Sequence, residues 1–193
     1  SDEHKKNYKV LDRAKHDQKP TANGKIVPDL DKLTNIAVEY YKNAGEQIKS
    51  SNTMTMLEVG RDKTGRLTFP YYNNSGQVIG IKHHKHPDYK NQKKGKALCF
   101  WEGNGDAKWY LADLLNDYDK NKPLFICEGE KDAIVLLRNE YNVICSSSPT
   151  TVPTLLPVFK KFKKIYLIYD NDEAGEKQSE KCAREIYQSL GIR

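Results

Sequence analysis

The sequence predicts an α/β protein: a C-terminal parallel sheet with flanking helices, preceded by a smaller α+β subdomain that contains an antiparallel β-meander. Short, continuously apolar runs alternate with helical segments after residue 118, a pattern typical of strands that are buried on both faces. Before that point, three runs of β type are separated by DKTG and NNSG, whose Asn, Asp and Gly residues suit tight hairpin turns.

The chain of 193 residues is expected to divide into three parts. Residues 1–28 are polar and rich in lysine, and we expect a flexible leader there. Residues 29–118 are expected to form the smaller subdomain: a helix in DLDKLTNIAVEYYKNAG that stops at Gly45, the meander from Met54, a basic loop, and a strand in ALCFWEG. Residues 119–193 are expected to form the parallel-sheet domain.

The parallel-sheet domain should contain three strands, in the runs LFICE, NVICSS and KIYLIYD. Helices are expected between them, in GEKDAIVLLRNEY and TVPTLLPVFKKF, and after them, from about Glu173 to Leu190. The segment AKWYLADLLNDY also has helical spacing. This alternation favours right-handed βαβ units.

The composition favours a polyanionic partner such as nucleic acid, because the formal net charge is +6 and the pI is about 9.0. No signal peptide and no span of about 18 apolar residues is present, so we expect a soluble intracellular protein with no membrane partner. The four cysteines are far apart and form no CxxC pair. The histidines of KHHKH have no cysteine nearby, so we expect no zinc in this chain.

Acidic residues follow two of the predicted parallel strands. Glu128 ends LFICE, and Asp170 and Asp172 follow KIYLIYD. If the two strands are neighbours, these carboxylates converge at one edge of the sheet, where Mg²⁺ or Mn²⁺ could bind. The alternative is that acidic residues stabilise the N-terminus of a helix, because the positive end of the helix dipole favours an anion by about 0.3–1 kcal/mol. That alternative applies to Glu130, Asp132, Glu173 and Glu176.

The run ICEGEKDAIVLL, followed some forty residues later by IYLIYDNDEAGEKQSEKCAREI, resembles a Toprim domain, the fold shared by bacterial-type primases and topoisomerases. The shared pattern is a strand with Glu-Gly-x-x-Asp and then a strand with Asp-x-Asp-x-x-Gly, which covers residues 123–193. The intervening SSSPTTVP resembles the turn that primases carry there. The resemblance implies a Rossmann-like parallel sheet.

The upstream run GRLTFPYYNNSGQVIGIKHH resembles the hairpin that precedes Toprim in the catalytic core of DnaG-type primases. Phage primase-helicases and the mitochondrial Twinkle helicase share this arrangement, and the resemblance covers about residues 33–109. It implies that the smaller basic subdomain and the Toprim edge flank a groove for template DNA and nucleotides.

The resemblance also implies residue roles. Glu128 would be the catalytic carboxylate, Asp170 and Asp172 would bind divalent metal together with Glu128, and Asp132 would support them. Primase Toprim domains usually carry a third acidic element after the next strand. The chain ends in SLGIR, so we expect a fragment that is truncated before this last acidic motif.

The loop KHHKHPDYKNQKKGK gathers cations that attract phosphates. Its DYKNQ piece resembles a Lys/Asn element that primases use near the nucleotide. The alternative is a solvated hairpin extension. The candidate residues for binding nucleic acid or nucleotide are Lys82, Lys85, Lys90, Asn91, Lys93, Lys94 and Lys96.

The predicted function is metal-dependent synthesis of RNA primers on single-stranded DNA by a primase core, a nucleotidyltransferase that uses Mg²⁺ or Mn²⁺. The expected partners are the DNA template, ribonucleoside triphosphates and a replicative helicase in cis or in trans. The expected location is the cytoplasm, at the nucleoid or replication fork, or an organellar matrix in a eukaryote. Two alternatives stay open: a Toprim nuclease or topoisomerase, and a degenerate primase module that only binds single-stranded DNA.

Overall fold

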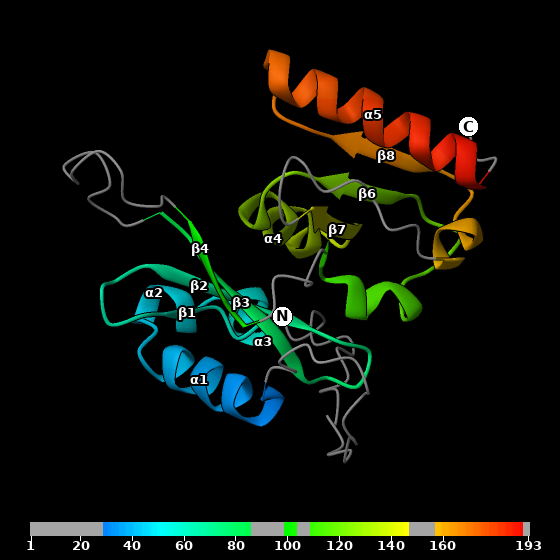
Figure 1. Cartoon of the computed structure of the whole chain (residues 1–193). Helices are drawn as coiled ribbons and strands as arrows, with labels where there is room; N and C mark the ends of the chain where they lie inside the picture. Colours follow the sequence, from blue (N-terminus) through cyan, green and yellow to red (C-terminus); the bar gives the residue numbers. More distant parts are fainter. Residues whose placement is uncertain (1–28, 86–98, 104–108, 147–156, 191–193) are drawn as a thin grey trace, which may run out of the picture.

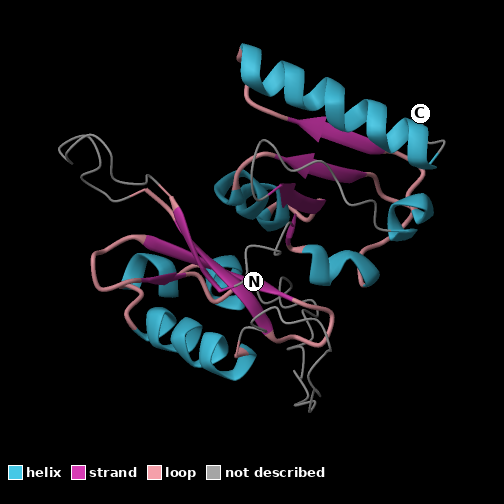
Figure 2. Ribbon diagram, viewed as in Figure 1, coloured by secondary structure: helices cyan, strands magenta, loops and turns pink. Residues whose placement is uncertain are grey.

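The structure is a computed structural model that describes residues 29–85, 99–103, 109–146 and 157–190. It contains two sheets, each with its own helices (Figures 1 and 2). The predicted fold class is confirmed, because the first sheet is antiparallel and the second is built on parallel strands. Within the described residues, no helix combines the length and the apolar character that a membrane span requires.

The first sheet is an antiparallel meander in chain order. Its strands are β1 (Gly60–Arg61), β2 (Leu67–Tyr72), β3 (Val78–His83) and β4 (Phe100–Gly103). Helix α1 (Leu30–Lys42) packs on it, and Leu33 and Ala37 are buried against Val78 and Ile81. The short helices α2 (Glu46–Lys49) and α3 (Asn52–Met56) connect α1 to β1.

The second sheet has the strand order β5-β7-β6-β8. Three parallel strands, β6 (Leu124–Cys127), β7 (Asn142–Ser146) and β8 (Ile165–Ile168), are joined by β5 (Trp109–Tyr110), which is antiparallel to β7. Helices α4 (Glu130–Arg138) and α5 (Glu173–Leu190) pack on opposite faces, as the alternation of side chains along β6 shows. Leu124 and Ile126 pack with α5 residues, whereas Cys127 packs with α4 residues.

The two sheets share a hydrophobic core. One cluster contains Phe69 and Tyr71 of β2 together with Cys127 of β6, Ile134 of α4 and Val143 of β7. Apolar side chains therefore hold the antiparallel sheet against the α4 side of the parallel sheet. The predicted division at residues 28/29 and 118/119 stays a prediction, although the pairing of β5 with β7 already places residues 109–110 in the second sheet.

Two predicted elements differ from the structure. The segment AKWYLADLLNDY is not an α-helix: β5 is followed by a 3₁₀ helix, η2 (Ala112–Asn116), because Leu111 takes a left-handed backbone conformation with φ of 67° that interrupts any helix. The first strand begins at Gly60 rather than near Met54. Ser51 accepts a hydrogen bond from Met54 N at 3.4 Å and so begins α3.

The segment TVPTLLPVFKKF is described only from residue 157 onward. There the predicted helix is a short 3₁₀ helix, η3 (Pro157–Lys161), whose Phe159 is buried. The helix α1 and the final helix α5 lie where the sequence predicted them. The three predicted parallel strands are also present, with β6 between β7 and β8.

Candidate functional site at the edge of the parallel sheet

Glu128 and Asp170 lie together at the carboxyl edge of the parallel sheet. Strands β6 and β8 are hydrogen-bonded neighbours, and Cys127 pairs with Ile168, so the chain leaves both strands at the same level. The Asp170 backbone N–H donates to Glu128 Oε2 at 3.4 Å. The sequence predicted that these carboxylates would converge if the two strands were neighbours, and β6 and β8 are neighbours. The roles of these residues stay predictions.

Asp172 directly precedes helix α5 and caps it. Its carboxylate Oδ1 accepts a hydrogen bond from Gly175 N at 2.8 Å, and its backbone O accepts one from Glu176 N at 2.9 Å. The helix start also approaches the preceding loop closely, because a Cβ on Gly175 would lie 2.1 Å from Asp170 O. A glycine at this position therefore lets α5 hold Asp170 and Asp172 beside β6. One oxygen of Asp172 remains outside this cap.

Asp132, in the first turn of α4, is a further carboxylate at the same edge, and its pKa responds to the negative charges around it. Burial raises the pKa of Asp132, and the charges of Asp170 and Glu130 raise it further against the opposing effect of Lys131. Gly129 gives this carboxylate room, because a Cβ there would lie 2.7 Å from Asp132 Oδ2. We refer to Glu128, Asp132, Asp170 and Asp172 as the acidic rim.

The acidic rim has the oxygen donors that Mg²⁺ and Mn²⁺ prefer. Burial and the charge of Asp170 raise the pKa of Asp132, and a bound cation would relieve this repulsion between carboxylates. Yet within the described ranges, no three His, Cys, Asp or Glu side chains are grouped closely enough to hold a metal ion by themselves. The residues thus fit a cation that takes one or two carboxylate ligands and completes its coordination with water or phosphate oxygens.

Asp172 has two separable functions if it both caps α5 and binds a cation. Asp172→Ala is expected to lower the free energy of unfolding by about 1 kcal/mol, because it removes the cap. Asp172→Asn keeps an equally good cap and removes only the charge, so stability should stay near that of the parent while Mn²⁺ affinity falls. Thermal unfolding and Mn²⁺ titration measure the two effects. Unchanged Mn²⁺ affinity in Asp172→Asn would assign this residue to the cap alone.

Glu130 is a functional candidate that the sequence assigned only to a helix dipole. It is 2% exposed, and its Oε1 accepts hydrogen bonds from Lys82 Nζ at 2.5 Å and from Tyr71 Oη at 2.6 Å. Lys82 and Tyr71 belong to the antiparallel sheet, whereas Glu130 is the first residue of α4. A buried ion pair therefore joins the two sheets two residues beyond Glu128. Nothing in the sequence pairs these residues, which are 48 positions apart.

The predicted basic residues divide into three groups. The side chain of Lys82 is 13% exposed and its ammonium is occupied by Glu130, so it contributes to the seam between the sheets rather than to an open surface. Lys85 is exposed just beyond β3. The remaining candidates lie outside the described residues: Lys90, Asn91, Lys93, Lys94 and Lys96.

His84 shows that positive charge collects where β3 meets α4. Burial lowers the pKa of His84, and the charge of Lys131 lowers it further, with smaller contributions of the same sign from Lys82 and Lys85. The charge of Glu130 acts in the opposite direction. Cations from β3 and from α4 therefore lie close to one another, and Lys131 directly precedes Asp132 of the acidic rim.

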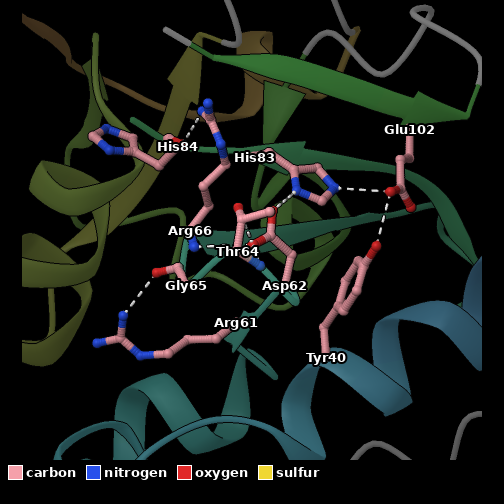
Figure 3. Close-up of polar contacts among 9 residues, drawn as sticks. All are labelled: Tyr40, Arg61, Asp62, Thr64, Gly65, Arg66, His83, His84 and Glu102. Atoms are coloured by element: carbon pink, nitrogen blue, oxygen red, sulfur yellow. Dashed lines mark hydrogen bonds and ion pairs between the residues drawn. The ribbon is translucent and has the colours of Figure 1, made fainter. Parts of the chain in front are cut away.

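A second buried network fixes the end of β3, as Figure 3 shows. His83 is 1% exposed; its Nδ1 lies 2.8 Å from Asp62 Oδ2, and its Nε2 lies 3.2 Å from Glu102 Oε1. Tyr40 of α1 donates to the same oxygen of Glu102 at 2.8 Å, and the imidazole stacks on Phe100 with 4.1 Å between ring centroids. A turn, two strands and a helix thus meet at His83.

Asp62 should make stability depend on pH. Burial raises the pKa of Asp62, but hydrogen bonds from Thr64, His83 and the Arg66 backbone outweigh it and hold the pKa below its ordinary value. The ionised carboxylate therefore stabilises the fold above about pH 4, and this contribution is lost as the pH falls through the lowered folded-state value. Asp62→Asn should lose about 1–3 kcal/mol at pH 7 and show a flatter acid dependence in urea unfolding.

The exposed Asp117→Asn is the matched control for this experiment. It should leave both the stability at pH 7 and the acid dependence close to those of the parent, because exposed substitutions usually change stability by less than about 0.5 kcal/mol. An Asp62→Asn variant with the parent's acid dependence would contradict the assignment of this network.

Comparison with known proteins finds a family match for the C-terminal part of the chain and a fold match for most of it. Residues 125–193 match the family model described as Toprim-like. No curated protein matches the sequence. The fold resembles the E. coli primase catalytic core with a TM-score of 0.61 and 14% sequence identity, over 84% of this chain and 69% of the other.

Two further solved structures show the same likeness. The RNA polymerase domain of Mycobacterium tuberculosis primase DnaG matches with a TM-score of 0.61 and 12% identity, over 84% of this chain and 71% of the other. A DnaG primase catalytic domain bound to single-stranded DNA matches with a TM-score of 0.58 and 16% identity, over 82% and 68%. The predicted resemblance to a Toprim domain and to the DnaG-type core is therefore confirmed at the level of fold.

Proposed function

We propose that this chain, whose residues 125–193 are Toprim-like within a DnaG-type core fold, is the catalytic core of a DNA primase. It would synthesise RNA primers on a single-stranded DNA template. The observation that carries the proposal is the convergence of Glu128, Asp132 and Asp170 at one edge of the parallel sheet, next to the antiparallel sheet. In open parallel sheets this edge is where ligands bind.

The acidic rim would hold the divalent cation through Glu128, Asp170 and Asp172, with Asp132 in support. A Mg²⁺ or Mn²⁺ ion there would stabilise negative charge that develops on the reacting phosphate. In the proposed reaction the 3′-hydroxyl oxygen bonds to the α-phosphorus of the incoming ribonucleotide, and the bond to pyrophosphate breaks. Glu128 would accept the hydroxyl proton; its position where β6 ends, beside the Asp170 backbone, supports this role.

The chain's cations would bind the polyanionic substrates. Lys85 and the loop residues Lys90, Asn91, Lys93, Lys94 and Lys96 would contact template or nucleotide phosphates, while Lys82 would act through Glu130 by fixing β3 against α4. The solved DnaG domain with single-stranded DNA supports this assignment by analogy of fold. A replicative helicase, in cis or in trans, is the partner that such an activity would serve.

The proposed function also implies a division of the chain into domains and a cellular location. The expected division would make residues 29–118 the template-binding subdomain and residues 119–193 the Toprim domain, with residues 1–28 as a leader. Primer synthesis would occur at the replication fork, in the cytoplasm or nucleoid of a bacterium or in an organellar matrix.

Template-directed dinucleotide synthesis tests this function. The protein is incubated with single-stranded DNA, labelled ribonucleoside triphosphates and Mg²⁺ or Mn²⁺. Glu128→Gln should abolish the product while preserving the fold, and the exposed Glu180→Gln should leave it unchanged.

The same assay separates the two alternatives. Cleavage of the DNA without dinucleotide product would favour a Toprim nuclease. Binding of single-stranded DNA without either reaction would favour a module that only binds DNA. Either result would contradict the proposed primase activity.

A further inference from the structure

A second strongly charged surface lies at the opposite end of the parallel strands from the acidic rim. Strands β6 and β8 begin side by side, because Leu124 pairs with Ile165 and Leu124 N donates to Lys164 O at 3.0 Å. The segments that lead into these two strands carry five exposed lysines, which we call the basic end. They are Lys122, Lys160, Lys161, Lys163 and Lys164.

The basic end is held by buried aromatic side chains. Phe159 and Phe162 alternate with the lysines and pack in one core cluster with Leu124 of β6 and Ile186 of α5. Phe162 N also donates to Phe159 O at 3.1 Å. The lysines therefore project from an anchored turn, and the aromatic residues of this segment do not add apolar area to the surface.

Positive charge accumulates here with little compensation. Among the residues that the structure describes, none of the five lysines forms an ion pair. Neighbouring Lys120 lies over the Phe162 ring and donates to Leu115 O and Tyr118 O at 2.7 and 2.5 Å. Burial lowers the pKa of Lys120, and the charge of Lys161 lowers it further, whereas Asp117 and Asp119 act in the opposite direction.

The favourable interaction of cations with the C-terminal end of a helix does not explain why these lysines are grouped. Only Lys160 and Lys161 lie in the last turn of η3, a five-residue 3₁₀ helix whose dipole is small. Lys163 and Lys164 follow the helix, and Lys122 comes from a different connection. A strand of four residues spans about 13 Å, so the basic end is separate from the acidic rim at the other end of β6.

We propose that the basic end binds the sugar-phosphate backbone of a single-stranded nucleic acid. Flexible ammonium groups suit a mobile chain of phosphates, because they act as point charges and need no fixed geometry. An acidic protein surface would need an apolar centre to bind stably, and here Phe159 and Phe162 are buried. This binding is independent of the chemistry proposed for the acidic rim.

Fluorescence anisotropy with a labelled oligothymidylate, in EDTA and over a series of salt concentrations, tests the proposal. The variant Lys160→Gln/Lys161→Gln/Lys163→Gln/Lys164→Gln removes four exposed charges. For single strands, each lost phosphate contact reduces the slope of log K against log salt by about 0.7, so the slope should fall by about 2–3. At low salt the affinity should drop at least tenfold. Circular dichroism checks that the fold is kept.

The control removes the same net charge from exposed lysines of the first sheet's side: Lys32→Gln/Lys42→Gln/Lys49→Gln/Lys63→Gln. This control variant should reduce the slope of log K against log salt by less than about 0.7, the value for one phosphate contact. Equal losses in both variants would show that net charge alone acts and would overturn the proposal. Tighter binding of polyglutamate than of oligothymidylate would also overturn it, in favour of an acidic protein partner.

Discussion

Glu130→Leu is expected to lower the free energy of unfolding by about 3–5 kcal/mol, the usual loss when one partner of a buried ion pair is removed. The substitution removes the carboxylate to which Lys82 and Tyr71 donate, while the Lys82 side chain stays only 13% exposed. Burial and the charge of Glu130 together raise the pKa of Tyr71, so this hydroxyl stays a donor that has lost its acceptor. Urea unfolding measures the loss.

The double variant Lys82→Met/Glu130→Leu distinguishes the ion pair from simple packing. Replacing both members of a buried pair with apolar side chains is often neutral or stabilising, so the double variant should be more stable than either single variant. The exposed Glu180→Gln should lie within about 0.5 kcal/mol of the parent. A Glu130→Leu protein as stable as the parent, or strictly additive losses in the double variant, would contradict the role of this pair in the seam.

Gly175→Ala is expected to destabilise the protein, although the same change inside an ordinary helix stabilises it by up to about 1 kcal/mol. The new Cβ would lie 2.1 Å from Asp170 O and 2.9 Å from Asp170 C, and neither backbone atom can move without displacing the loop. Overpacking of this kind costs about 1–3 kcal/mol or more. Because the loop carries Asp170 and Asp172, Mn²⁺ affinity should fall together with stability.

Gly45→Ala is the matched control, because a Cβ at Gly45 would meet nothing within 4 Å and its φ of −71° suits any residue. This variant should lie within about 1 kcal/mol of the parent's stability, because Gly45 is the N-cap of α2 and alanine caps less well, and it should keep the parent's Mn²⁺ affinity. Thermal unfolding and Mn²⁺ titration of both variants measure the difference. A Gly175→Ala protein that behaves like Gly45→Ala would show that the close approach of α5 to Asp170 does not matter.

The sequence predicted the elements that have strong local patterns. The apolar runs of β6 and β8 could be recognised because strands buried on both faces need continuous apolar residues, and neighbouring parallel strands then bring Glu128 and Asp170 to one edge. The helix predicted over Trp109 and Tyr110 was wrong. The apolar spacing of this segment suits a helix as well as a strand, and only the tertiary pairing with β7 makes it a strand.

The polar network of the seam could not be predicted, since contacts over long separations leave no local pattern. Glu130 follows a glycine in a first helical turn, a position that a helix dipole explains by itself, and Lys82 belongs to a run of cations. Their pairing depends on how β3 packs against α4. His83 was likewise one of three histidines in a basic run, until the fold placed Asp62 and Glu102 on its two nitrogens.

Paramagnetic broadening by Mn²⁺ tests the central claim, that the acidic rim is a divalent-cation site. In the NMR spectrum of the labelled protein, a small amount of Mn²⁺ should broaden the amide signals of Glu128, Gly129 and Asp170 before those of the antiparallel sheet. Glu128→Gln/Asp170→Asn should lose this selectivity, whereas Glu180→Gln should keep it. Uniform broadening in the parent, or selective broadening that survives in the double variant, would contradict a cation site at the acidic rim.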